Sequence, residues 1–203
     1  MPAGSISRSR RIALLALARG AGGVSLAAGW PALLHAQALP PTPACGADEA
    51  PTAPQTEGPF YKRATPERTS LVESGMDGER LTLVGQVVTT GCRPLPGTWL
   101  DFWQADAHGQ YDTEGYRLRG HVIAGADGRY RLETIVPGGY PGRTRHIHVK
   151  VRPPGGRVLT TQLYFPDEPL NLRDGLYMPA LQMRLARDAQ GANGRFDFVL
   201  RAT

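Results

Sequence analysis

Two histidines separated by a single residue are the first feature of this 203-residue chain that could bind a metal ion. His146 and His148 lie in the segment His146–Arg152, whose apolar residues alternate as in a β-strand. Because the side chains of a strand alternate between its two faces, both imidazoles should project from the same face. A His-x-His pair alone is more often solvent-exposed or hydrogen-bonded than metal-bound, so further ligands are needed.

Two tyrosines upstream of these histidines lie in segments that predict irregular loops. Tyr140 follows Pro137-Gly138-Gly139, and Tyr111 follows a polar stretch after a predicted strand. Taken alone, each tyrosine is typical of a packing or surface residue. Their interest comes from their order along the chain relative to the histidine pair.

Five segments, in order, resemble the intradiol ring-cleavage dioxygenases, the family of protocatechuate 3,4-dioxygenase and catechol 1,2-dioxygenase. The resemblance spans roughly Gln55 to Phe165. Its segments are Gln55–Tyr61, Trp103–Ala105 with Tyr111 eight residues after the tryptophan, Pro137–Tyr140, Arg143 with His146-Ile147-His148, and Thr161–Phe165. Five matches in order are far more specific than any one of them.

The resemblance implies that one non-haem Fe(III) ion per chain is bound by Tyr111, Tyr140, His146 and His148. It also implies that a small aromatic diol and O2 are the substrates. The ring is then cleaved between its two hydroxyl-bearing carbons to a cis,cis-muconate-type dicarboxylate. A trivalent cation stabilises the phenolate form of tyrosine, whose ordinary pKa is about 10. This ligand set differs from the usual zinc sites and from the two-histidine, one-carboxylate set of ferrous oxygenases, and it suits Fe(III).

The resemblance gives catalytic roles to two residues. Tyr140 is the axial ligand that leaves when the substrate binds, and Arg143 stabilises negative charge on the attacked ring; a surface position is the alternative for Arg143. Contacts with the substrate, or around the metal ligands, are expected from Gln162, Trp103, Gly58, Pro59 and Phe60. Packing explains these five equally well. Structural roles are predicted for His108, His121, Asp106 and Asp112.

The chain departs from the family in two places. Only five residues separate Tyr140 from His146, fewer than in the protocatechuate and catechol enzymes, which predicts a more open pocket. The helical N-terminal region through which catechol 1,2-dioxygenases pair has no counterpart, so the oligomeric state stays open. The natural substrate is open as well, although a carboxylated ring could be favoured by three arginines, Arg117, Arg119 and Arg145.

The elements that must position these residues are predicted to be short strands, each ending at Gly, Pro, Asn or Asp. They are Leu81–Val88, Thr98–Gln104, Gly120–Ala124, Arg129–Ile135, His146–Arg152, Thr160–Phe165 and Phe196–Leu200. Ala126-Asp127-Gly128 is expected to join the third and fourth strands as a hairpin. Helical periodicity is possible only around Leu181–Arg187. The pattern favours an all-β fold, a two-sheet β-sandwich whose long loops carry the metal site.

The N-terminal residues predict an export leader. Ser9-Arg10-Arg11 is similar to a twin-arginine signal, and Ala36-Gln37-Ala38 has the small-x-small form that signal peptidases cut. We expect residues 1–38 to be a twin-arginine-type signal peptide, 39–55 a proline-rich tether and 56–203 the catalytic domain. The protein would then be periplasmic or extracellular. A basic arm or a retained anchor is the alternative, although Arg19 and nearby glycines interrupt any long apolar span.

Charge and cysteine content limit the remaining possibilities. The chain has 23 basic and 18 acidic residues, and the predicted leader holds four of the basic ones, so the rest is almost neutral. Nucleic acid is therefore not an expected partner, and no membrane span is expected after the leader. Cys45 and Cys92 are the only cysteines; one disulfide and two free thiols are equally open.

Two other functions remain possible from the residues alone. One is a non-catalytic secreted β-sandwich that binds a ligand through its tyrosines and histidines. The other is a copper or zinc site formed by His146 and His148 without the tyrosines. Only the dioxygenase interpretation requires all four side chains to meet.

Overall fold

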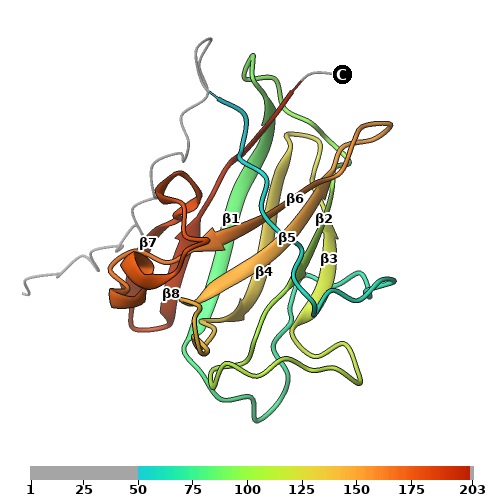
Figure 1. Cartoon of the computed structure of the whole chain (residues 1–203). Helices are drawn as coiled ribbons and strands as arrows, with labels where there is room; N and C mark the ends of the chain where they lie inside the picture. The colour runs from blue at the N-terminus through green and yellow to red at the C-terminus, as the bar shows by residue number, and fades with distance from the viewer. Residues whose placement is uncertain (1–49, 202–203) are drawn as a thin grey trace, which may run out of the picture. The chain divides into compact units, whose positions relative to one another are not determined.

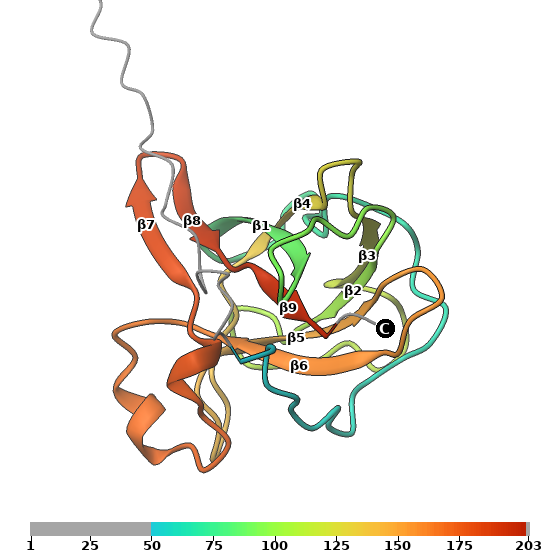
Figure 2. The same ribbon diagram turned by 90° about the horizontal axis from the view of Figure 1, so that it is seen from above.

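Alternating apolar side chains fold the described part of the chain, residues 50–201 of a computed structural model, into two β-sheets that pack face to face (Figures 1 and 2). The predicted all-β, two-sheet sandwich is confirmed. The predicted leader, most of the tether and Cys45 lie outside the described residues. Cys92 takes part in a disulfide. Within the described residues, no helix is long and apolar enough to cross a membrane.

The first sheet is built around the longest strand, β1 (Arg80–Thr89). The strand order is β4 (Arg129–Ile135), β1, β8 (Gly191–Arg195) and β7 (Arg184–Asp188). β9 (Phe198–Leu200) continues the sheet by pairing in parallel with the end of β1. Every second side chain of β1, including Leu81 and Leu83, is buried in the core between the sheets.

The second sheet carries most of the predicted site residues. Its order is β3 (Arg119–Ile123), β2 (Trp99–Trp103), β5 (His146–Arg152) and β6 (Leu159–Tyr164), and all neighbours are antiparallel. Ile147, Val149 and Val151 of β5 point into the core and are completely buried. The intervening residues of β5, His146 and His148 among them, therefore face outward from the sandwich.

A segment that precedes β1 covers this outer face. In Figure 1 it is the cyan chain that crosses β5 and β6. Gln55 donates its backbone N–H to Thr160 at 2.8 Å, and Thr161 Oγ1 donates to the carbonyl of Ala53 at 2.7 Å. Thr65 Oγ1 donates to Asp101 of β2 at 2.6 Å. Polar side chains on the outer face are therefore buried beneath the segment.

One prediction about the strands was wrong. β3 and β4 do not form a hairpin, because β3 pairs with β2 and β4 with β1 in the opposite sheet. The Asp-Gly turn between them therefore connects the two sheets, so that both strands contribute apolar side chains to the same core.

No α-helix covers Leu181–Arg187. Of two short 3-10 helices, η1 (Pro169–Arg173) precedes this region and η2 (Pro179–Leu181) ends at its first residue. After them the Met183 backbone N–H donates to Tyr164 at 2.9 Å, and the chain continues as β7, which pairs with β8. Sheet pairing thus prevails over the helical spacing of Leu181 and Leu185.

Candidate metal centre

The two histidines lie together at the start of β5, each with only 2% of its surface exposed. His146 Nδ1 donates to the carbonyl of Thr144 at 2.7 Å, because a carbonyl can only accept. In neutral His146 this leaves Nε2 with a free lone pair. That atom lies 3.1 Å from His148 Nε2. A metal that binds two imidazole nitrogens at about 2.1 Å in adjacent positions brings them to roughly this separation.

Both imidazoles are neutral at neutral pH, as metal ligation requires. Burial, together with the nearby Arg143, lowers the pKa of His146 to about 4. Burial also lowers the pKa of His148 well below its ordinary value, with His146 and Arg143 acting in the same direction. The pair can therefore donate electron pairs without first losing protons.

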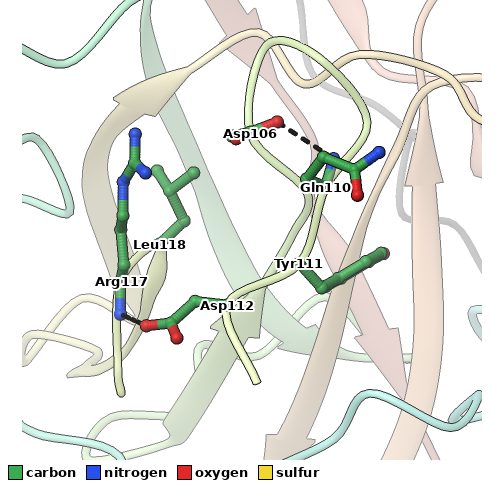
Figure 3. Close-up of a pocket in the computed structure, with 6 residues that line it drawn as sticks. All are labelled: Asp106, Gln110, Tyr111, Asp112, Arg117 and Leu118. Carbon is green, nitrogen blue, oxygen red and sulfur yellow. Dashed lines mark hydrogen bonds between the residues drawn. The ribbon is translucent and has the colours of Figure 1, made fainter. Parts of the chain in front are cut away.

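Two aspartates organise the loop that carries Tyr111 (Figure 3). Asp106 Oδ1 accepts the backbone N–H of Gln110 at 2.9 Å, and Asp112 Oδ2 accepts that of Arg117 at 2.8 Å. Their carboxylates hold backbone, in line with the structural role predicted for them. The Tyr111 ring stacks on Phe60, with ring centroids 4.3 Å apart. The loop thus fixes the direction of the phenol.

Two glycines allow this loop to pack against the loop that carries Tyr140. A Cβ on Gly138 would lie 2.5 Å from the carbonyl oxygen of Ala107, and one on Gly109 would lie 2.4 Å from that of Gly139. Gly109 also has a φ of 80°, a left-handed conformation that favours glycine. The backbones can therefore touch, which brings Tyr111 and Tyr140 together.

A tight turn presents Tyr140 and Arg143 side by side. The Arg143 backbone N–H donates to the Tyr140 carbonyl at 2.8 Å. Pro141 in the second position and Gly142, with a φ of 79°, in the third are typical of a type II turn. Across the turn, Arg143 Nη1 lies 3.5 Å from Tyr140 Oη. The Pro/Gly spacing noted in the sequence therefore sets this pairing.

The four predicted metal ligands converge. Ring centroids are 6.0 Å apart for Tyr111 and Tyr140, and 5.7 Å apart for Tyr140 and His146. They are 4.8 Å apart for the two histidines and 6.3 Å apart for His148 and Tyr111, which closes the circuit. Each ring thus neighbours two others around a common centre.

Unpartnered polar atoms belong to residues of this circuit and to Trp103, which stacks on it. Among the described residues, three buried side-chain atoms have no hydrogen-bond partner: Tyr111 Oη, His148 Nδ1 and Trp103 Nε1. A buried polar atom without a partner is costly, so such a cluster indicates a ligand site. Burial raises the pKa of the Tyr111 hydroxyl, and the nearby Tyr140 acts in the same direction. A cation is therefore needed to make Tyr111 a phenolate.

The donor set fits a hard trivalent cation better than it fits a zinc site on the histidines alone. No group of three or more His, Cys, Asp or Glu side chains suitable for a metal occurs in residues 50–201. Without the tyrosines only two protein ligands would remain, fewer than zinc usually has. Two phenols with two imidazoles match Fe(III).

The other predicted contact residues surround the ligands. Trp103 stacks on His148 with centroids 4.8 Å apart, and the backbone of Gly58 lies over the same imidazole. Gln162 pairs with His148 across β5 and β6. Phe60 lies on Tyr111. Pro59 is exposed and lines a neighbouring cavity of about 220 Å³.

Arg143 lies in a network that sequence reasoning only partly anticipated. Its Nη2 donates to Gln162 Oε1 at 2.5 Å, and its Nε donates to Asp174 Oδ2 at 3.0 Å. Burial alone would lower the pKa of Arg143, but the hydrogen bond with Asp174 and the nearby Tyr140 raise it. Asp174 lies beyond the last recognised motif, and no sequence signal distinguished it.

Of the three arginines that could favour a carboxylated ring, two are engaged within the protein. Arg119 donates to the carbonyls of Phe60 at 2.6 Å and Asp112 at 2.8 Å, thereby joining the covering segment to the Tyr111 loop. Arg145 pairs with Glu168 at 3.1 Å. Arg117 is exposed and lines a cavity of about 320 Å³ beside Tyr111 (Figure 3).

Comparison with known proteins agrees with this geometry. A family model described as "Dioxygenase" matches residues 56–202. The dioxygenase domain of a dioxygenase carbohydrate-binding protein fusion from Streptomyces sp. SirexAA-E is 55% identical, with a TM-score of 0.74, and the match covers 76% of this chain and 100% of that one.

Curated relatives are more distant. Catechol 1,2-dioxygenase from Pseudomonas sp. (strain EST1001) is 30% identical over 58% of this chain and 48% of its own length. The protocatechuate 3,4-dioxygenase beta chain from Burkholderia cepacia is 36% identical over 49% of this chain and 50% of its own length. The chain thus spans about half the length of the curated relatives it matches. These matches do not favour a non-catalytic binding module, and the chain belongs to the intradiol ring-cleavage dioxygenase family of oxidoreductases.

Proposed function

We propose that this protein binds one non-haem ferric ion per chain through Tyr111, Tyr140, His146 and His148. With this ion it cleaves a catechol-type ring between the two hydroxyl-bearing carbons. O2 is the second substrate, and a cis,cis-muconate-type dicarboxylate is the product. The observation that carries the proposal is the closed circuit of two neutral imidazoles and two phenols, in which the buried Tyr111 hydroxyl has no hydrogen-bond partner.

A ferric ion held there would supply a Lewis acid that binds both oxygens of the diol and makes the ring reactive toward O2. The protein's own residues provide orientation, charge and shielding. Trp103 and Phe60 form apolar walls against His148 and Tyr111, which limits the access of water. Because Gly58 has no side chain, the space beside the His148 imidazole stays open; a Cβ there would lie 3.4 Å from His148 Cε1.

Tyr140 is better suited than Tyr111 to move during the reaction. Tyr111 is stacked on Phe60, and the Arg119 guanidinium lies 5.9 Å from its ring centroid. Tyr140 lies on a turn whose Gly142 has open space around it and whose Pro141 is exposed. We therefore assign to Tyr140 the departure that makes room for the diol and the acceptance of one of its protons.

Arg143 supplies a positive charge beside Tyr140. Its guanidinium faces the Tyr140 oxygen, so it can stabilise the phenolate and the negative charge that develops on the ring beside it. Removal of one such preorganised donor typically lowers kcat by about 100-fold or more.

Ring cleavage with isotopically labelled oxygen tests the proposal. The iron-loaded protein, supplied with catechol and 18O2, should consume one O2 per catechol. Mass spectrometry should find the open-chain diacid, with one labelled atom in each of its two new carboxyl groups. An aldehyde product from cleavage outside the diol, or no product from fully loaded protein, would contradict it.

A further inference from the structure

The segment that follows β6 also contacts the proposed site, next to the covering segment, whose Gln55 Nε2 donates to the Leu176 carbonyl at 2.9 Å. Its Asp174 has a side chain with 1% of its surface exposed. Asp174 Oδ2 accepts from Arg143 Nε and from the Thr144 backbone N–H, both at 3.0 Å, and Oδ1 accepts from the Leu176 N–H at 2.9 Å. The carboxylate thus joins this segment to the residues just before the histidine ligands.

The contact with Nε restricts the whole Arg143 head group. A guanidinium is planar, so an acceptor on the Nε edge sets the plane in which the two terminal nitrogens lie. With Nε held by Asp174, Nη2 reaches Gln162 Oε1 at 2.5 Å and Nη1 faces Tyr140 Oη at 3.5 Å. Each of the three nitrogens has its own acceptor, and Asp174 is the only carboxylate among these acceptors.

A second residue of the segment supports the ligand strand. Thr144 Oγ1 donates to Asn171 Oδ1 at 2.8 Å, and Asn171 Nδ2 donates to the Phe165 carbonyl at 2.9 Å. The Thr144 carbonyl in turn accepts from His146 Nδ1. The segment therefore holds Arg143 through Asp174 and His146 through Asn171 and Thr144.

We propose that Asp174 is a positioning residue for ring cleavage, which acts by holding the Arg143 guanidinium in the orientation that faces Tyr140 and the substrate ring. The inference rests on the proposed function. It predicts that loss of the carboxylate slows turnover while the four metal ligands stay in place. Displacement of a catalytic group by about 1 Å can cost on the order of 100-fold in rate.

The experiment compares kcat per bound iron for the wild type, Asp174→Asn, Arg143→Gln and the double variant. Iron content and anaerobic catechol binding are measured on each protein. Asp174→Asn should keep iron and catechol affinity within about threefold of the wild type and lose at least tenfold in kcat, the usual scale for such supporting contacts. Combined with Arg143→Gln, it should cause no further loss, because both changes remove the same oriented guanidinium.

Glu168→Gln is the matched control. Glu168 lies on the same segment, and its ion pair is with Arg145, two residues after Arg143. Its removal breaks a more exposed ion pair between the same two segments and should leave kcat within about twofold of the wild type.

Arg143→Lys provides a second test that does not depend on the folding of Asp174→Asn. Lysine keeps the charge but lacks the Nε–H and the planar head group that Asp174 orients. If orientation matters, Arg143→Lys is as slow as Arg143→Gln; wild-type turnover in Arg143→Lys would overturn the proposal. So would full kcat per iron in Asp174→Asn, or effects of the two changes that multiply. An inactive wild type with bound iron would instead reject the proposed function.

Discussion

At the scale of single residues, the unpartnered atoms of the site are the most informative feature. Tyr111 Oη and His148 Nδ1 are buried without hydrogen bonds, whereas Tyr130 Oη, also buried, donates to the Phe196 carbonyl at 2.8 Å. Leaving a buried polar group unpartnered costs about 1–3 kcal/mol. A phenol kept in that state is explained by a ligand that it binds.

This contrast makes Tyr111→Phe a sharp test. The change should abolish most iron binding, because one of the four donors is lost. It should leave the thermal stability of the metal-free protein unchanged or raised, since an unpartnered hydroxyl is removed. Metal analysis and calorimetry on the same preparation measure both effects.

Tyr130→Phe should behave in the opposite way. It should destabilise the protein by about 1 kcal/mol, because the Phe196 carbonyl loses its donor, and it should leave the iron content unchanged. Equal iron content in Tyr111→Phe and the wild type would show that Tyr111 is not a ligand.

At the scale of elements, the site depends on two loops whose backbones touch. The Tyr111 loop follows β2, and the Tyr140 loop follows β4. The two loops touch where Gly109 and Gly138 come close together. The two loops come from different sheets, since β2 and β4 lie in different layers. The proposed metal site therefore links the two sheets.

Gly138→Ala should separate the two loops. Its Cβ would lie 2.5 Å from the Ala107 carbonyl oxygen, so the Tyr140 loop must shift and iron affinity should fall at least tenfold. Gly175→Ala is the matched control, because a Cβ at Gly175 meets nothing within 4 Å. Iron titration followed by visible absorption measures both; equal affinities would show that the loops do not need this contact.

Strand alternation predicted most of the elements and the shared face of the two histidines. The motif order predicted four candidate ligands, and the structure brings these four side chains together. The β3–β4 connection was missed because an Asp-Gly turn does not reveal whether the strands it joins pair or cross between sheets. Asp174 and Asn171 were missed because their role depends on contacts with Thr144 and Arg143, about thirty residues earlier, and a single sequence carries no sign of them.

At the scale of the whole molecule, the site lies on the outer face of the second sheet and not in the sandwich core. The covering segment buries it, through contacts such as Gln162 Nε2 with the Thr56 carbonyl at 2.9 Å. Core side chains and site side chains therefore alternate along the same strands. Changes to the proposed metal ligands should affect iron binding far more than folding.

We propose that residues 1–38 direct this protein out of the cytoplasm as a twin-arginine leader, a route generally used by proteins that fold before transport. Replacing Arg10 and Arg11 together by lysine should retain the protein in the cytoplasm. Cell fractionation with immunodetection measures the distribution, and unchanged export of the double variant would reject the proposal.

The visible spectrum of the purified protein, together with its iron content, tests the central claim most directly. The account predicts one iron per chain and a red colour from phenolate-to-ferric charge transfer. The band should shift when catechol is added under nitrogen and disappear when a chelator removes the iron. A colourless protein with one bound iron per chain would contradict it, because no phenolate would then be bound to the metal.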